Sequence, residues 1–286
     1  MKVFSRLFGK DNPYDQAQRR VNKLFEGNQR GVHFVSVVLL GLISVLLTFL
    51  AMRWPEDAPP PIYLPYVLFA VFSFMMPGVA HRMISGERES ESLELLLVAP
   101  VSAMQVLAAK FRRAFTGILI TLAFTLLPVL GWVLAKMISP RPGTYDELLF
   151  YVFGSLHLVF FGAVVLSFSL LVSAYSKTNA ASLITSLAVL LVTLLVAPIL
   201  VGLLTAAMSV EYLLSWHPAI QLGMAQESVV PLRGDGADYG ALLGWTLLPV
   251  PLNTVLAGAM LWFAARRLET ERLQGHSISE TIHAGS

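Results

Sequence analysis

The stretch Glu87–Pro100 reads ERESESLELLLVAP and is a charged segment that separates two long apolar runs. Its first eight residues contain four glutamates and one arginine, and four consecutive aliphatic residues, Leu95 to Val98, follow before the proline. Such an aliphatic run has to be buried in the bilayer, in the protein or in a partner. We therefore interpret the segment as an element that receives a signal and moves the helices around it. The alternative is a solvated loop whose charges only orient those helices.

The composition is that of a membrane protein. Of the 286 residues, 56% are hydrophobic and only 13% are charged, whereas soluble domains carry about 25% charged residues. Six apolar stretches are long enough to cross a bilayer as helices. The predicted fold class is therefore an all-α membrane protein with six transmembrane helices. The chain contains no cysteine, which excludes disulfides, a thiol nucleophile and cysteine-based metal sites.

We expect the six spans at about residues 32–52, 62–80, 114–135, 148–174, 180–208 and 240–265. They divide the chain into an N-terminal segment 1–31, a six-span domain 32–266 and a polar tail 267–286. The domain contains the charged element 85–101 and an outer segment, 209–239.

Two features outside the spans carry further predictions. In 1–31, Asn12 and Pro13 are a good helix start, and the basic amphipathic pattern after them is typical of a helix in the headgroup plane. The alternative is a solvated helix that packs on another subunit. In 209–239, Pro218 can start a short helix that re-enters the membrane, with an ordinary surface loop as the alternative.

Lysine and arginine are distributed unevenly, which predicts the orientation. With the N-terminus inside, the inside segments hold sixteen of the twenty: seven in 1–30, five in 81–113, Lys177, and three after the sixth span. The outside loops hold the other four, namely Arg53, Lys136, Arg141 and Arg233. Both termini and the charged element are therefore expected on the cytoplasmic side.

The charged element should contain two helices. Glu87, Glu91 and Glu94 fall at i, i+4 and i+7 and would share one helix face, and Pro100 would end that helix near Val98. Ser102-Ala-Met-Gln105 then has the pattern of a capping box. The helix that it starts should continue into the third span.

At these residues the sequence resembles the ABC-2 family of ABC transporter permeases. The matching pattern is Glu87-Arg88-Glu89, Leu93-Glu94-Leu95-Leu96-Leu97, Pro100-Val101-Ser102 and Lys110. The family usually has Gly-Thr before the Leu-Glu pair, where this chain has Glu91-Ser92. The six-span layout, with an amphipathic helix before it, is also similar to the family.

The resemblance implies a permease without its own ATPase. It would pair with a second permease copy or a paralogue and with cytosolic ABC ATPase subunits, which would bind ATP and Mg²⁺, so this chain itself binds no cofactor. The element 85–101 would be the coupling helix, and Glu87, Arg88, Glu89, Glu94 and Leu95 would form the ATPase-coupling interface. The expected location is the inner membrane of a bacterium, and no nucleic acid partner is expected.

The sequence contains no motif that indicates another kind of chemistry. The chain has no G-x-x-x-x-G-K-[ST] phosphate loop, and its six histidines show no metal-ligand spacing. His157 is an ionisable residue deep in a predicted span, which makes it a candidate functional site. The alternative is a neutral imidazole that bonds to a neighbouring helix. Pro249 and Pro251 should kink the sixth span.

The predicted function is that of an exporter permease for a lipid, a drug or another amphipathic molecule. A scaffold or regulatory subunit that binds an ATPase without passing a substrate is the main alternative. An intramembrane enzyme that uses His157 is a third. The substrate is left open by the sequence.

Overall fold

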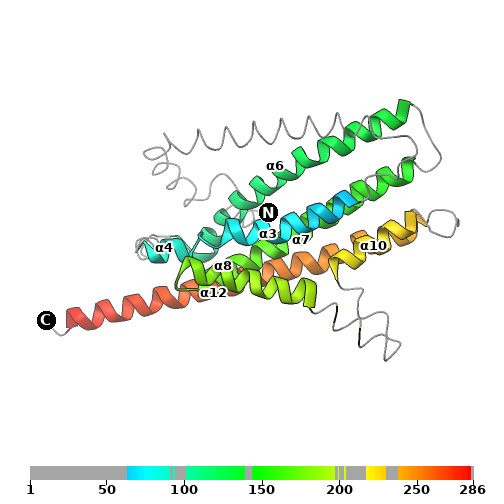
Figure 1. The fold of residues 1–286 in the computed structure, drawn as a ribbon. Helices are drawn as coiled ribbons and strands as arrows, with labels where there is room; N and C mark the ends of the chain where they lie inside the picture. Colours follow the sequence, from blue (N-terminus) through cyan, green and yellow to red (C-terminus); the bar gives the residue numbers. More distant parts are fainter. Residues whose placement is uncertain are drawn as a thin grey trace, which may run out of the picture.

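The computed structural model describes residues 63–90, 93, 101–138, 144–196, 199, 203, 217–229 and 238–284. Within these residues every regular element is helical and no strand occurs (Figure 1). The predicted first span, the amphipathic helix in 1–31, and the two predicted interface residues Glu94 and Leu95 lie outside the described residues.

The helices follow in chain order with these bounds: α3 Tyr63–Ala80, α4 Ser85–Glu89, α6 Ala103–Ile138, α7 Thr144–Tyr175, α8 Asn179–Leu191, the π-helical segment η1 Val192–Val196, α10 Pro218–Val229, α11 Tyr239–Leu247 and α12 Pro249–Ala284.

Helix α7 is the centre of the bundle. It packs against α3, α6, α8, α10, α11 and α12. The main core cluster joins buried side chains of α7 such as Leu158 and Leu166 to Met76 of α3 and Leu222 of α10. Figure 1 shows α4 at one end of this bundle and α10 at the other. The junction described below therefore lies at the α4 end of the bundle.

Three of the described helical segments are long and apolar enough to cross a membrane: Leu148–Tyr175, Asn179–Val196 and Tyr239–Leu273. In an apolar 18-residue stretch of the first segment, 56% is buried inside the protein. In the corresponding stretches of the other two segments, only 17% and 22% are buried. The fourth predicted span is thus surrounded by protein, whereas the fifth and sixth expose apolar surface. The six-span count stays a prediction, although α3 matches the predicted 62–80 closely.

The predicted sixth span is divided. Helix α11 ends at Leu247 and α12 begins at Pro249, where the missing N–H of proline breaks the helical hydrogen-bond ladder. The interruption falls at one of the two predicted prolines, and the kink itself stays a prediction. Helix α12 then continues to Ala284 through the predicted tail 267–286. At 1.5 Å per residue this extension is roughly 27 Å long, and it projects past α4 in Figure 1.

Candidate functional site: the junction around α4

The short helix α4 occupies the charged segment, but its bounds differ from those predicted. The expected helix ran from Glu87 to about Val98, whereas α4 begins at Ser85 and ends at Glu89. At its C-terminal end, the Ser90 hydroxyl donates back to the carbonyls of Gly86 and Glu87, at 2.9 and 3.2 Å. Glu91 and Glu94, which were predicted to share the helix face of Glu87, lie outside the described residues.

The start of α4 is set by Ser173, a buried residue near the end of α7. Its Oγ accepts hydrogen bonds from the amides of Ile84 and Ser85, at 3.2 and 3.0 Å, and donates to the carbonyl of His81 at 3.0 Å. One hydroxyl has one proton to donate and two lone pairs to accept, so Ser173 uses its full capacity here. Because no side chain of the preceding residues caps α4, the first amides of the helix depend on α7.

Glu87 ties α4 to α6. Its carboxylate accepts a 2.5 Å hydrogen bond from the Lys110 ammonium, which also donates to the carbonyl of Met83 at 2.5 Å. The Lys110 side chain is only 8% exposed. It lies before the predicted third span, and its burial lowers the pKa of Lys110 below the usual lysine range, although the charge of Glu87 opposes that shift. A buried ammonium of this kind needs its carboxylate partner.

Arg88 ties α4 to α7 and α12. Its guanidinium donates to the carbonyls of Ala174, at 2.9 Å, and Ser176, at the C-terminal end of α7 where carbonyls lack helical partners. The same guanidinium pairs with both carboxylate oxygens of Glu271 on α12, at 2.9 and 3.1 Å. Glu271 also pairs with Arg267 at 3.0 Å. Both bonds to Glu271 come from one nitrogen, Nη2, which lies between the two carboxylate oxygens, and they are strengthened by the opposite charges.

Glu89 ties α4 to α8. Its carboxylate accepts from the backbone amide of Asn179 at 2.8 Å and from the side-chain amide of the same residue. Asn179 is the first residue of α8, so a carboxylate here is favoured by the free amides and the positive end of the helix dipole. Asn179 also accepts from the Ser85 hydroxyl at 2.9 Å. The helix itself is capped by Thr178.

The start of α6 confirms the predicted capping box. The Ser102 amide donates to Gln105 Oε1 at 2.9 Å, and the Gln105 amide donates to Ser102 Oγ at 3.2 Å. Val101 packs beside the buried Val106 of the first turns, as a hydrophobic staple would. The Val101 carbonyl also accepts a 3.2 Å hydrogen bond from Arg272 of α12, so the C-terminal helix reaches the start of α6 too.

Together these contacts make a junction, which we define as Glu87, Arg88, Glu89 and their partners Lys110, Ser173, Asn179 and Glu271. Three consecutive charged residues bind four helices of the bundle, α6, α7, α8 and α12. The arrangement links these four helices to one short helix. Of its partners, Ser173 and Glu271 were missed in the sequence, since nothing local marks either residue.

His157, the predicted intramembrane candidate, lies near the middle of α7 and is 1% exposed. Neither ring nitrogen makes a well-formed hydrogen bond with the described residues, although the carbonyl of Pro218 lies beside the ring. His217, just before α10, is also buried and its Nε2 is 3.2 Å from the carbonyl of Leu194 in η1. Helix α10 does begin at Pro218 as predicted. Its re-entry into the membrane and the role of His157 stay predictions.

The comparison with protein families settles the class of protein. Residues 14–256 match the ABC-2 family transporter protein. The chain belongs to this family. Chains of this ABC-2 family are membrane subunits that work with separate ATPase subunits and are not ATPases themselves. Among curated proteins, none matches the sequence.

Proposed function

We propose that this chain is the permease subunit of an ATP-driven exporter in the inner membrane of a bacterium. Cytosolic ABC ATPase subunits bind and hydrolyse ATP, and a second permease copy or paralogue completes the pathway. The ATPases dock on the segment that contains α4, and the amphipathic helix predicted in 1–31 supplies the second part of that interface. Both termini lie in the cytoplasm.

The observation that carries the proposal is the junction at α4. A force applied to this short helix reaches α6 through Lys110, α7 and α12 through Arg88, and α8 through Asn179. Charge-assisted hydrogen bonds are short and directional, so they transmit displacement better than apolar contacts that can slide. In this account Glu87, Arg88 and Glu89 turn toward the bundle, and Glu94 and Leu95 meet the ATPase.

The cargo we propose is a lipid, a drug or another amphipathic molecule. Apolar side chains cover the exposed flanks of α8, η1 and α12, among them Ile184, Leu195, Leu252 and Val255. Within the described part of the predicted spans, the ionisable side chain deep in a helix is the buried His157. A path with so few charges suits an apolar or amphipathic molecule better than a small ion.

The test is to purify the tagged chain with the ATPase encoded beside it and to measure ATP turnover in lipid. Glu94→Lys and Leu95→Asp should weaken the complex or uncouple its ATP turnover. Glu227→Lys is the matched control, because Glu227 is exposed on α10 at the opposite end of the bundle. It should behave like the wild type.

Two results would overturn the proposal. If no ATPase co-purifies, the chain is not an exporter permease. If an ATPase binds but Glu94→Lys and Leu95→Asp leave both complex and turnover unchanged, the docking site is wrong. A complex that hydrolyses ATP but moves no lipid or dye between leaflets would favour the scaffold alternative.

A further inference from the structure

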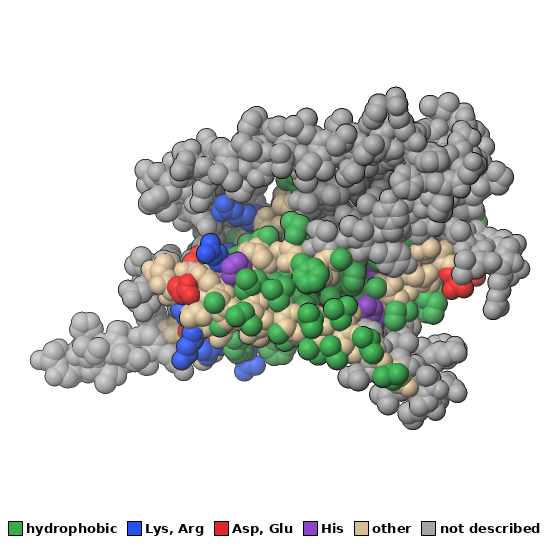
Figure 2. Space-filling view, viewed as in Figure 1, with side chains coloured by type: hydrophobic (Ala, Val, Ile, Leu, Met, Phe, Trp, Pro, Cys, Tyr) green, Lys and Arg blue, Asp and Glu red, His purple; other side chains and the backbone are tan. Residues whose placement is uncertain are grey.

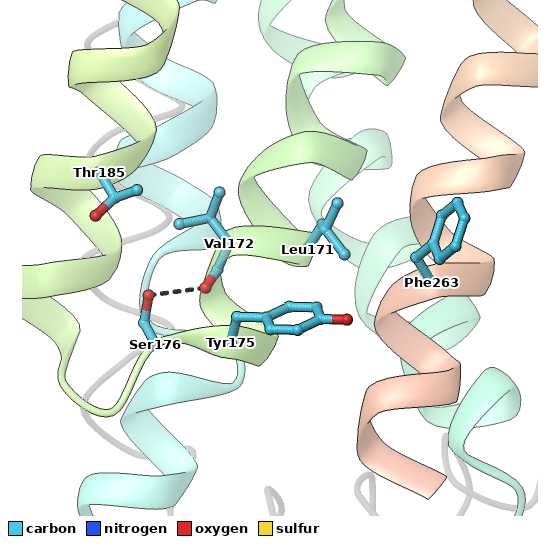
Figure 3. Close-up of a pocket in the computed structure, with 6 residues that line it drawn as sticks. All are labelled: Leu171, Val172, Tyr175, Ser176, Thr185 and Phe263. Atoms are coloured by element: carbon cyan, nitrogen blue, oxygen red, sulfur yellow. Dashed lines mark hydrogen bonds between the residues drawn. The ribbon is translucent and has the colours of Figure 1, made fainter. Parts of the chain in front are cut away.

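A groove of about 400 Å³ lies between α7, α8 and α12 near the α4 end of the bundle. It is lined by Leu171, Val172, Tyr175, Ser176, Thr185 and Phe263. Figure 3 shows the Tyr175 ring reaching from α7 toward α12, with Leu171 and Phe263 above it and Thr185 on the opposite wall. The volume falls in the range of small-molecule sites, and its walls are largely apolar.

Basic side chains gather at the α4 end of this groove. Arg267 lies one turn after Phe263 on α12, and its guanidinium is 5.5 Å from the centre of the Tyr175 ring. Arg266 is exposed and stacks over Trp262 at 5.5 Å. Lys177 follows Ser176 directly and is also exposed. Figure 2 shows Lys and Arg side chains at this end and apolar side chains along the flank.

Positive charge exceeds negative charge at this end, where three carboxylates (Glu89, Glu269 and Glu271) stand with five cations (Arg88, Lys177, Arg266, Arg267 and Arg272). Glu271 accepts from both Arg88 and Arg267, so one carboxylate serves two guanidiniums. Arg266 and Lys177 form no ion pair with the described residues. An apolar groove that ends in unbalanced positive charge is complementary to a molecule with an apolar chain and an anionic head.

We propose that the groove binds one anionic phospholipid of the cytoplasmic leaflet. An acyl chain lies against Leu171, Val172 and Phe263, and the phosphate group meets Arg266, Arg267 and Lys177. Basic pockets between transmembrane helices on the cytoplasmic side are the usual place for such headgroups. The inference rests on the membrane family and the expected orientation of the chain, and it holds whether or not the protein transports a substrate.

A lipid suits the groove better than a soluble ligand because its walls face outward. Tyr175 and Phe263 are 58% and 49% exposed, on helices that are apolar enough to lie in a bilayer. Aromatic and basic residues side by side are typical of the membrane–water boundary. The site also touches the junction, because Arg267 shares Glu271 with Arg88.

The experiment is a native mass spectrometry titration of the purified full chain with phosphatidylglycerol and with phosphatidylcholine of the same acyl chains. The variant Lys177→Gln/Arg266→Gln removes charge, and Thr185→Phe fills the groove. Arg113→Gln and Ile184→Phe are the matched controls, since Arg113 is an exposed residue of α6 and Ile184 is exposed on α8 without lining the groove. Thermal unfolding in phosphatidylcholine checks that every variant is folded.

We expect the wild type to prefer phosphatidylglycerol, and Lys177→Gln/Arg266→Gln to lose about fivefold in affinity for each charge removed. Thr185→Phe should weaken the binding of phosphatidylglycerol, and both controls should match the wild type. Equal affinity for the two lipids would overturn the proposal. So would a charge effect that Arg113→Gln reproduces, because attraction would then be general, or an unchanged affinity in Thr185→Phe, because the lipid would then lie elsewhere.

Discussion

The two ends of the bundle are built from different interactions. At the α4 end, Glu87, Arg88 and Glu89 reach α6, α7, α8 and α12 through charged hydrogen bonds. At the α10 end, helices meet mainly through apolar side chains, such as Leu222 and Ala225 of α10 against α7 and α11. One polar contact there, between His217 and the Leu194 carbonyl, joins an imidazole ring to a residue of the π-helical segment η1.

This difference indicates that the two ends of the bundle have different roles. Directional bonds between charged groups hold one relative arrangement of helices, whereas apolar surfaces can shift by small steps at lower cost. π-helical segments such as η1 occur frequently at functional sites. In our account the α4 end receives the force from the docked ATPases and transmits it to the other helices. The α10 end contains the surfaces that move.

The largest effect on stability is expected at Lys110. Lys110→Met leaves the Glu87 carboxylate in a largely buried place without its cation, and should lower the free energy of unfolding by about 3 kcal/mol. The double variant Glu87→Gln/Lys110→Met removes both charges and should recover most of that loss. Thermal unfolding in detergent, followed by tryptophan fluorescence, measures both. A double variant as unstable as the single one would show that the pair does not hold α4.

A somewhat smaller effect is expected from Leu222 at the other end. Leu222→Ala removes a fully buried side chain from the main core cluster and should cost about 2 to 3 kcal/mol through the cavity it leaves. The comparison predicts that the ATP turnover of the assembled complex stays close to wild type in this variant, because α4 is untouched. A strong loss of turnover in Leu222→Ala would break the proposed division between the two ends.

Ser173 tests the start of α4. Ser173→Ala leaves the amides of Ile84 and Ser85 without their acceptor, and should destabilise the protein by about 2 kcal/mol. Ser169→Ala is the matched control on the same helix, because among the described residues its buried hydroxyl bonds only to the Val165 carbonyl one turn earlier. That control should change stability by less than about 0.5 kcal/mol. Equal effects in the two variants would remove Ser173 from the junction.

Ser102 should give the smallest effect among these side chains. Ser102→Ala removes the cap of α6, which is typically worth about 1 kcal/mol. Because the box is reciprocal, Gln105→Ala should cost less, and the double variant should cost less than the sum of the two. The free energies of unfolding of the three variants and the wild type give the interaction energy between Ser102 and Gln105 directly. Strict additivity would mean that the two side chains do not act as a unit.

The pH dependence of stability sharpens the interpretation of Lys110. The pKa of Lys110 is lowered on folding, so between its folded value and its usual value of 10.5 the unfolded chain holds more protons. Stability then rises with pH in that interval. The wild type should therefore gain stability relative to Lys110→Met as the pH is raised toward 10.5. A difference between the two proteins that is constant over the alkaline range would contradict the buried environment of Lys110.

The features that were predicted correctly are local ones. The capping box lies within four residues, and Pro249 ends a helix through its own missing N–H. The orientation of the charged side chains in α4 was not predictable in this way. The partners of Glu87, Arg88 and Glu89 are 23, 183 and 90 residues away along the chain, and no pattern within a helix specifies such pairs.

The two partners that were missed in the candidate site, Ser173 and Glu271, also lie far along the chain from α4. Glu271 lies in the segment that was predicted to be a polar tail. It contacts Arg88 because α12 continues as a helix through that segment. Ser173 is one of several serines in an apolar span, and its sequence context does not distinguish it from Ser169. The early end of α4 at Glu89 was also not predicted, because the periodic glutamates favoured a longer helix.

The most direct test of the central claim is a charge-swap cycle on Arg88 and Glu271 in the complex with the partner ATPase. The readout is ATP turnover in lipid for Arg88→Glu, Glu271→Arg and the double swap, with co-purification as a check of assembly. We predict that both single variants assemble but lose coupled turnover. The double swap should restore part of it, because the ion pair is regained while the hydrogen bonds to the carbonyls of Ala174 and Ser176 stay lost. Single variants with wild-type turnover, or a double swap no better than either single variant, would contradict the claim that the junction carries the signal from α4 into the bundle.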